Sequence, residues 1–522
     1  MNQNIKRVLA GVLAGGMMLS FAACGNRTGN DGKHTQGDGG AVFDKPTEIK
    51  IAISSHPSWP YDSEWKMWKY LQEATGAVTK VQAIPDSDFD TKVSLMMASP
   101  SDLPDLLHFT HKYSVDKYTS SGALIAIDDN LDKMQNYVKF FDSLPKEQAE
   151  EMKMQRRSGD GKIYAPPVYG TQTVNGLRTW IYRKDVFEKE NLAVPTTYDE
   201  VYETAKILKQ RYPNSYPLCF REGMDKLRMM GSQWKEYFSY DVYYDFNSNK
   251  WSYGVTEPIM KDIVTYLRKL YDEKLVPPDF LTMNTKTWEE LMSTDRGFLT
   301  IDYIVRIDFF NLLSRKDNPA YTLATMEPPA ANVSTGKRQL PQLNFDFTGY
   351  AVCNTGKQDR IDNALKLLDW MYSDEGADLM GWGKEGETYE VVDGKKRFIL
   401  PSADDTPRAL YGAASYGLYQ RMDVAANEAG YTEEQIAECH KALQYTEAHA
   451  NPMWWLPFSD EEQRRKTDLS TEIDEYVKEM LSKFIMGQEP LSKWDQFQKE
   501  LHKMNIDELV SIFDAAYTRV MG

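Results

Sequence analysis

The feature that most constrains the fold is an alternation of strand and helix patterns near the start of the chain. Apolar and polar residues alternate along TEIKIAIS (47–54), which predicts a strand. Two further strands are predicted at VTKVQAI (78–84) and PDLLHFT (104–110). A helical pattern at 63–74 separates the first two, and DTKVSLMMASPSDLPD supplies a helix before the third. This order is typical of a parallel sheet with crossover helices, so we predict an α/β fold.

The later chain is richer in helix patterns. TTYDEVYETAKILKQRYP opens with Thr197 and Glu200 in capping-box spacing, and its helix ends at Pro213. RIDNALKLLDWMYSDEG carries an apolar stripe, and we expect its helix to end near Gly376. After about Asp404 the pattern is mainly helical. The C-terminal part is therefore predicted to be rich in helices.

The first residues have the pattern of a secretory signal. Two basic residues precede a mostly apolar run at 8–21 that is too short for a comfortable membrane span. Two alanines and then Cys24 follow, which resembles the lipobox of bacterial lipoproteins; the alternative is a chance cysteine beside an ordinary cleavage site. We predict a signal peptide at 1–23, lipidation of Cys24, and a flexible tether within 24–45.

Composition narrows the class of protein. The chain has 522 residues, of which 42% are hydrophobic, and is long enough for two to four domains. Its formal charge is −16, which becomes −18 when Lys6 and Arg7 leave with the signal, and clustered basic residues that would bind nucleic acid do not stand out. Three cysteines besides Cys24 leave an odd number, so we expect buried free thiols at the positions Cys219, Cys353 and Cys439.

Several stretches, in one order along the chain, resemble a known family. It is the family of extracellular solute-binding lipoproteins of bacterial ATP-driven (ABC) uptake transporters, family 1, in its large branch associated with oligosaccharides. The resemblance spans nearly the whole mature chain. Each stretch alone is a weak signal, and the strength of the match comes from finding the stretches in the order that the family has. They are MMASPSDLPDLLHF, SGALIAIDD, GKIYAPPV with WIYRKDVFEKENLAVPTTYDEV, ALKLLDWMYSDEGADLMGWGKEGETYEVVDGK, and FIMGQEPLSKWDQFQKELHKM.

The resemblance implies a two-lobed α/β fold of the class II periplasmic-binding-protein type, with a hinge and a ligand cleft between the lobes. We expect the chain to cross between lobes near 168–175, near 345–349 and near 395. The expected first lobe is 46–170 plus 345–395, and the second is 171–344 plus 396–522.

The function implied is capture of an oligosaccharide by a membrane-anchored monomer that delivers it to the permease subunits of an importer, without catalysis. Two alternatives stay open: a receptor for peptides or other polar solutes, since one fold serves many ligands, and a surface glycoside hydrolase. A hydrolase would need two carboxylates that face each other across a cleft. No nucleophile elbow, phosphate-binding loop or zinc-protease motif occurs in the sequence.

A sugar-binding cleft needs aromatic rings for the apolar faces of the sugar and polar side chains for its hydroxyl groups. We select residues that lie in loops or at the ends of predicted elements, with Asp88, His111 and Glu222 as neighbours. The candidate ligand-binding residues are Trp59, Asp86, His108, Arg221, Trp234, Tyr303, Trp382, Trp454 and Trp455.

No metal or cofactor is predicted. Some relatives carry a calcium loop of alternating Asp and Asn before a strand, but the corresponding stretch here reads KQRYPNSYPLCF, which lacks that ligand series. DFNSNKWSYG (245–254) offers Asp and Asn but places Glu257 one residue too late for such a loop, so we predict a hairpin turn. His108 and His111 lack partners at metal-site spacing.

Overall fold

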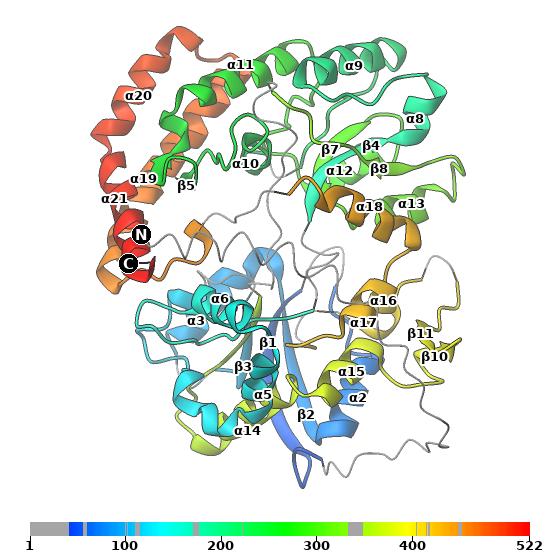
Figure 1. Cartoon of the computed structure of the whole chain (residues 1–522), viewed down its shortest axis with the longest axis vertical. Coiled ribbons are helices and arrows are strands. Elements are labelled where there is room, and N and C mark those ends of the chain that lie inside the picture. Colours follow the sequence, from blue (N-terminus) through cyan, green and yellow to red (C-terminus); the bar gives the residue numbers. More distant parts are fainter. Residues whose placement is uncertain are drawn as a thin grey trace.

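The computed structural model shows two lobes, one above the other in Figure 1. Lobe 1 comprises the described residues 41–170 and 348–429, and lobe 2 comprises 177–331 and 431–521, because the buried side chains of each set form separate clusters. The signal, Cys24 and most of the tether lie outside the described residues. These are 41–55, 60–99, 101, 103–109, 115–170, 177–221, 223–331, 348–402, 405–413, 415, 418–446 and 452–521.

Lobe 1 is built on a four-stranded sheet with the order β2-β1-β3-β9. β1 (Thr47–Ser55), β2 (Ala77–Pro85) and β3 (Leu106–Phe109) are parallel, which confirms the predicted strand–helix alternation. β9 (Gly349–Val352) joins from much later in the chain and runs antiparallel to β3. β1 is central and its Ile49, Ile51 and Ile53 are fully buried, so the apolar alternation that predicted it faces the core.

Helices and one hairpin complete lobe 1. A predicted single helix ending near Gly376 is wrong: the structure divides it at Ser373, whose Oγ accepts from the Gly376 N–H at 2.9 Å and caps a second helix. The elements are α2 (Lys66–Thr75), η1 (Asp86–Asp88), α3 (Phe89–Met97), η3 (Asp128–Lys133), α5 (Gln135–Ser143), α6 (Lys146–Arg156), α14 (Gln358–Trp370), α15 (Asp374–Trp382), β10 (Tyr389–Val392), β11 (Lys395–Phe398), α16 (Pro407–Tyr411) and α17 (Val424–Ala429).

Lobe 2 has a smaller sheet, in which β4 (Arg178–Arg183) lies between β7 (Leu299–Tyr303) and β8 (Leu323–Thr325), antiparallel to both. A separate hairpin, β5 (Val242–Asp245) and β6 (Lys250–Tyr253), turns at 246–249 and confirms the predicted hairpin. Its Asn249 has a φ of 53°, a conformation that asparagine tolerates better than most residues.

Most of lobe 2 is helical, as predicted for the C-terminal part. The capping box of Thr197 and Glu200 is confirmed at the start of α9. The helices are α8 (Lys184–Lys189), α9 (Tyr198–Arg211), α10 (Asp225–Gly231), η4 (Gly254–Thr256), α11 (Pro258–Asp272), α12 (Thr285–Met292), α13 (Arg306–Ser314), α18 (Glu433–Leu443), η5 (Pro452–Trp454), α19 (Asp460–Met486), η6 (Leu491–Lys493), α20 (Trp494–Lys503) and α21 (Ile506–Met521).

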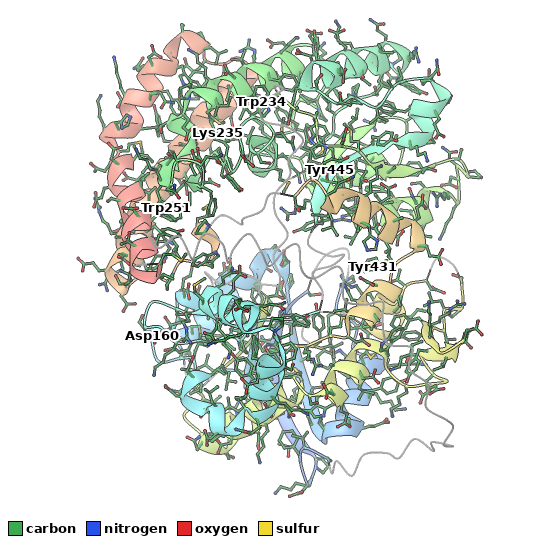
Figure 2. All side chains as sticks on the ribbon, viewed as in Figure 1. Asp160, Trp234, Lys235, Trp251, Tyr431 and Tyr445 are labelled. Atoms are coloured by element: carbon green, nitrogen blue, oxygen red, sulfur yellow. The ribbon has the colours of Figure 1, made fainter. Side chains whose placement is uncertain are left out.

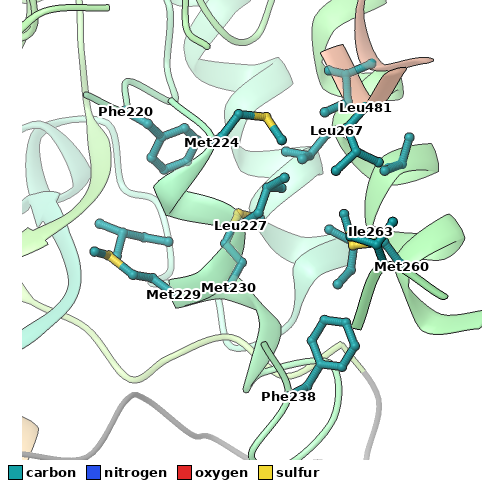
Figure 3. Packing of buried hydrophobic residues seen from close by; sticks show 14 of the residues in the cluster. Phe220, Met224, Leu227, Met229, Met230, Phe238, Met260, Ile263, Leu267 and Leu481 are labelled. Carbon is teal, nitrogen blue, oxygen red and sulfur yellow. The ribbon is translucent and has the colours of Figure 1, made fainter. Parts of the chain in front are cut away.

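The main core of lobe 2 joins its sheet to the long helices. Figure 3 shows Leu227 and Met230 of α10 between Phe220 and the side chains that α11 presents, such as Ile263. Leu481 of α19 closes the far side of α11. This packing fixes α10 and the strand ends beside it to the body of lobe 2.

The core clusters show where the chain passes from one lobe to the other. Buried packing changes from lobe 1 to lobe 2 between Tyr169 and Leu177, and back between Ala331 and Tyr350. We expected a third crossing near 395, and this is too early: residues from Phe398 to Ala429 pack in lobe 1, and the change follows Ala429. This part of the chain stays in lobe 1 because Phe398 stacks on Trp382 of α15, and Trp65, at the start of α2, donates to the Ala409 carbonyl.

The three cysteines outside the signal region are buried and free, as predicted. Burial raises the pKa of the Cys439 thiol to about 11 and raises the pKa of Cys219 and Cys353 well above its ordinary value. These thiols therefore stay protonated and act as small apolar groups. Over the described residues, no helix combines the length and hydropathy needed to cross a membrane.

The lobes also touch at a point away from the crossings. Met154, on the last turn of α6 in lobe 1, packs against the main core of lobe 2. Close by, a Cβ added to Gly159 would lie 2.0 Å from the carbonyl oxygen of Phe458 in lobe 2. The two backbones can approach this closely only because residue 159 has no side chain.

We predict that Gly159→Ala separates the lobes at this contact without unfolding either core. The added methyl group overlaps Phe458, and neither cluster contains residue 159. Spin labels at the exposed positions Lys69 and Glu203, one on each lobe, should report a longer or broader distance distribution, with little change in the thermal midpoint. Glu150→Ala, at an exposed position of α6, should leave the distribution unchanged; an unchanged distribution in Gly159→Ala would contradict the prediction.

Candidate ligand-binding site

The ends of two strands mark the region where the lobes face each other. Phe109, the last residue of β3, pairs with Gly349, which closely follows the second crossing. In lobe 2, Tyr303, the last residue of β7, pairs with Arg178, which closely follows the first crossing. Both carboxyl ends are therefore paired with residues that closely follow a crossing in the sequence. Ligands of open α/β sheets bind beyond the carboxyl ends of strands, so this region is the candidate site.

On the lobe 1 side, the predicted residue Asp86 begins η1 directly after β2 and is exposed. Its Oδ1 accepts from the Ser54 hydroxyl at 2.7 Å, which joins the carboxyl ends of β1 and β2. The neighbouring Asp88 is exposed as well. Trp59 and His111 lie outside the described residues. Asp86 therefore presents a carboxylate at the edge where we expect a ligand.

His108 lies inside lobe 1, not on its surface. Its side chain is 3% exposed and its ring lies edge-on to Tyr350, with the centroids 5.3 Å apart. Burial, together with the charge of Arg156, lowers the pKa of His108 to about 4, so the ring is neutral at physiological pH. We selected it as a residue at a strand end, but β3 continues to Phe109 and all of its residues are buried. We leave it out of the site.

On the lobe 2 side, Tyr303 and Arg178 form a stacked pair. The guanidinium carbon of Arg178 lies 3.9 Å from the centroid of the Tyr303 ring, and its Nη2 donates to the phenol oxygen. Both side chains are partly exposed. Such cation–π stacking fixes an otherwise mobile arginine, so the pair holds a positive charge and a ring edge at the carboxyl end of β7.

The predicted residue Arg221 is present at this edge but is engaged inside lobe 2. Its Nε and Nη2 donate to the two oxygens of Asp302 at 2.7 and 2.8 Å. Lys226 Nζ lies 3.3 Å from the same carboxylate, and the Tyr303 N–H donates to it at 2.8 Å. Asp302 is fully buried. This network fixes the backbone that presents Tyr303.

Electrostatics in this cluster are dominated by cations. Burial would raise the pKa of Asp302, but Lys226, Arg221 and Arg306 outweigh it and hold that pKa well below its ordinary value. Burial and the charge of Arg221 lower the pKa of Arg306, whose Nη1 donates to Glu289 at 2.8 Å. Asp302 is therefore ionised at every physiological pH, and its oxygens are bound by the buried cations.

The predicted tryptophans divide between core and partly buried positions. Trp382 packs inside lobe 1: it is 3% exposed, donates from Nε1 to Asp423 at 2.8 Å, and stacks on Phe398, so we leave it out of the site. Trp455 is 5% exposed in the main core of lobe 2. An aromatic residue in a loop can face the solvent or the core. Its position in the sequence therefore did not show that Trp382 and Trp455 pack inside their lobes.

Trp234 is partly buried, with its ring beside Tyr198 and Tyr266 at centroid distances of 5.1 and 5.8 Å. It follows α10 closely, and Figure 2 shows it within the body of lobe 2. Trp454 belongs to η5, but its side chain lies outside the described part of the structure, as does Glu222. Trp234 and Trp454 remain predictions as ligand-binding residues.

Three residues of this region were missed in the sequence. Arg178 stands at the start of an aromatic strand right after a predicted crossing, which was a usable signal. Tyr445 follows α18 and donates to Glu327 at 2.8 Å, and Figure 2 shows Tyr445 on the side of lobe 2 that faces lobe 1. Burial and this hydrogen bond raise the pKa of Tyr445 to about 12. Residues 327 and 445 meet only in the folded chain, so no local pattern marks them.

The described residues contain no group of three or more His, Cys, Asp or Glu side chains suited to a metal ion. The predicted absence of a metal and of a cofactor stays a prediction. Within the described ranges, the polar groups at the strand ends are instead a carboxylate, a guanidinium, phenols and hydroxyls. Such groups form hydrogen bonds with a polar solute, and the rings of Tyr303 and Tyr445 can contact its apolar faces.

Comparison with known proteins agrees with this architecture. The profile of the family described as bacterial extracellular solute-binding protein matches residues 60–378. Lipoprotein LipO of Bacillus subtilis (strain 168) is 25% identical over 376 residues, which are 69% of this chain and 71% of LipO. The fructooligosaccharide ABC transporter substrate-binding protein FusA of Streptococcus pneumoniae serotype 4 is 21% identical over 97% of each chain.

A similar fold is found in a solved structure. The crystal structure of the alginate-binding protein AlgQ2 without calcium ion superposes with a TM-score of 0.75 at 22% sequence identity. The match covers 92% of this chain and 99% of AlgQ2. The two-lobed fold is therefore shared with AlgQ2.

We predict that Asp302→Asn destabilises lobe 2. An amide in place of the carboxylate leaves Arg221 and Lys226 buried beside a neutral group, and breaking a buried ion pair in this way costs about 3 to 5 kcal/mol. Urea unfolding should show this loss in the free energy of unfolding. Asp272→Asn, which removes an exposed partner of Arg268, should change stability by less than about 1 kcal/mol. Equal effects of the two substitutions would refute the role given to Asp302.

Proposed function

Because this chain belongs to the family of bacterial extracellular solute-binding proteins, we propose that it is the receptor of an ATP-driven importer. It captures an oligosaccharide between its two lobes and delivers it to the permease subunits in the membrane. The receptor acts by binding alone, and the loaded monomer is the form that the permease recognises.

The observation that carries this proposal is the position of the strand ends relative to the crossings. Each lobe buries its own clusters, the chain passes between the lobes three times, and the carboxyl ends of β3 and β7 pair with residues that closely follow such a passage. Lobes with independent cores can rotate as rigid bodies about short connections. A ligand held at both strand ends would then bridge the lobes and favour their closure.

The chemistry at these ends suits a sugar. Asp86 in lobe 1 and Glu327 in lobe 2 offer carboxylate acceptors, while Arg178 offers donors. Tyr303 and Tyr445 add rings with polar tips, which match the mixed apolar and hydroxyl surface of a sugar. FusA and AlgQ2, which share this fold, are named for a fructooligosaccharide and for alginate, and we extend the oligosaccharide class to this chain.

Both sides of the site serve capture rather than hydrolysis. A glycosidase needs one protonated and one ionised carboxyl group on opposite sides of the scissile bond. Among the described residues of the site, Asp86 accepts from Ser54 and Glu327 accepts from Tyr445, an arrangement of hydrogen-bond acceptors that suits capture.

The receptor is held at the outer face of the cell membrane by a lipid on Cys24. The apolar run, the small pair of alanines and the glycine-rich tether that surround Cys24 support this, and LipO is named as a lipoprotein. A lipid anchor with a flexible tether keeps the two lobes near the permease while leaving them free to close.

The first test is a thermal-shift screen of the protein against oligosaccharides and short peptides. A ligand that binds only the folded state stabilises it by about 2.7 kcal/mol at a concentration one hundred times its Kd, so a true ligand must raise the unfolding midpoint. We expect shifts with one series of oligosaccharides and intact sugar recovered afterwards. Shifts with peptides alone would refute the sugar class, and release of smaller sugars would refute capture without cleavage.

The anchor is tested separately with Cys24→Ala. Removing the thiol removes the site of lipid attachment, so the protein should move from the membrane fraction to the culture supernatant. Fractionation followed by immunoblotting measures this change. Asn26→Ala, a substitution two residues away in the tether, should stay with the membrane; membrane retention of Cys24→Ala would contradict the assignment.

A further inference from the structure

Arg178 is a positive charge at the candidate site that lacks a negative partner. Within the part of the chain that the structure describes, it forms no ion pair with a carboxylate, and its side-chain contacts are both with Tyr303. A guanidinium carries five N–H donors, and the Tyr303 phenol accepts only one of its hydrogen bonds. The remaining donors of a partly exposed side chain are available to a ligand.

The nearest buried carboxylate cannot neutralise Arg178. Asp302 precedes Tyr303 on β7, but both of its oxygens are engaged by Arg221 and Lys226 inside lobe 2. Glu289 is engaged by Arg306. The carboxyl end of β7 therefore gathers four cationic side chains around carboxylates that are already bound, in a protein whose overall charge is −16.

The orientation of Arg178 is also fixed before any ligand arrives. Stacking on Tyr303, with 3.9 Å between the guanidinium carbon and the ring centroid, removes much of the freedom that an exposed arginine keeps. A planar, oriented guanidinium matches a carboxylate through two parallel hydrogen bonds, and this match is weaker for an uncharged hydroxyl group. The geometry favours an anionic ligand group over a neutral one.

We propose that Arg178, held by Tyr303, binds a carboxylate of the ligand, so that this receptor selects acidic oligosaccharides that contain uronic acid residues. This inference rests on the proposed function and specifies its substrate class. Arg178 is then the residue that determines specificity at the lobe 2 end of the site. The protein as a whole is acidic, so this local arrangement is what makes an anionic ligand favourable at the lobe 2 end of the site.

The test is isothermal titration calorimetry with oligouronates of three to six residues, each compared with its own methyl ester. Esterification removes the charge and keeps the sugar skeleton. We expect the acid form of one series to bind at least about tenfold more tightly than its ester, because hydrogen bonds to charged groups are the stronger ones. Its affinity should also fall as salt is added, while that of the ester should not.

Arg178→Gln should weaken binding of the acid form by roughly tenfold or more and leave the ester unchanged, and Arg178→Lys should recover part of the loss. Arg296→Gln serves as the matched control: its side chain is exposed and paired with Glu290, near the opposite end of β7. An unchanged thermal midpoint shows that each variant is folded.

The outcomes separate this inference from the proposed function. Equal affinity for acid and ester, or an equal loss for both in Arg178→Gln, overturns the carboxylate assignment. Binding of neutral oligosaccharides with none to oligouronates overturns it too, and leaves the receptor function standing. Failure of every oligosaccharide, acidic and neutral, removes the proposed function together with this inference.

Discussion

The structure depends on the separation of its apolar residues into two cores that do not merge. Each lobe buries its own sheet and helices, and the chain passes between them three times. Among the described residues, Met154 of lobe 1 packs against the core of lobe 2 near the close approach at Gly159, while the buried members of each cluster come from a single lobe. A ligand that contacts both lobes therefore needs only modest binding energy to favour one arrangement.

The separation into two lobes also determines where the polar side chains of the candidate site lie. The carboxyl ends of β3 and β7 pair with residues close to crossings, and the polar groups there come from segments far apart in the sequence. The cost is visible in lobe 2, where Arg221 and Lys226 are buried and need Asp302 to remain so. That network leaves Arg178 as the cation at the end of β7 whose donors can face a ligand, held in place by an aromatic ring.

Sequence patterns predicted elements better than they predicted the site. The parallel strands of lobe 1, the capping box of α9 and the β5–β6 hairpin follow from local rules of alternation, capping and turn chemistry, and the structure confirms them. The helix boundary at Gly376 failed because Ser373 is a stronger local signal, an N-cap, than a glycine that resembles a helix end. The crossing near 395 failed because which lobe a segment covers depends on packing partners, not on its own composition.

By itself, the sequence determined the kinds of elements, their order, the family to which the chain belongs and the free state of its buried cysteines, because periodicity, capping and motif order are local properties. Tertiary structure alone decided that His108 and Trp382 are buried and that Arg221 is paired with Asp302. It also decided that Arg178 stacks on Tyr303 at the edge between the lobes. Burial and charge pairing here are set by residues outside the local stretch of sequence, such as Asp423 for Trp382 and Asp302 for Arg221, and no local pattern carries that information.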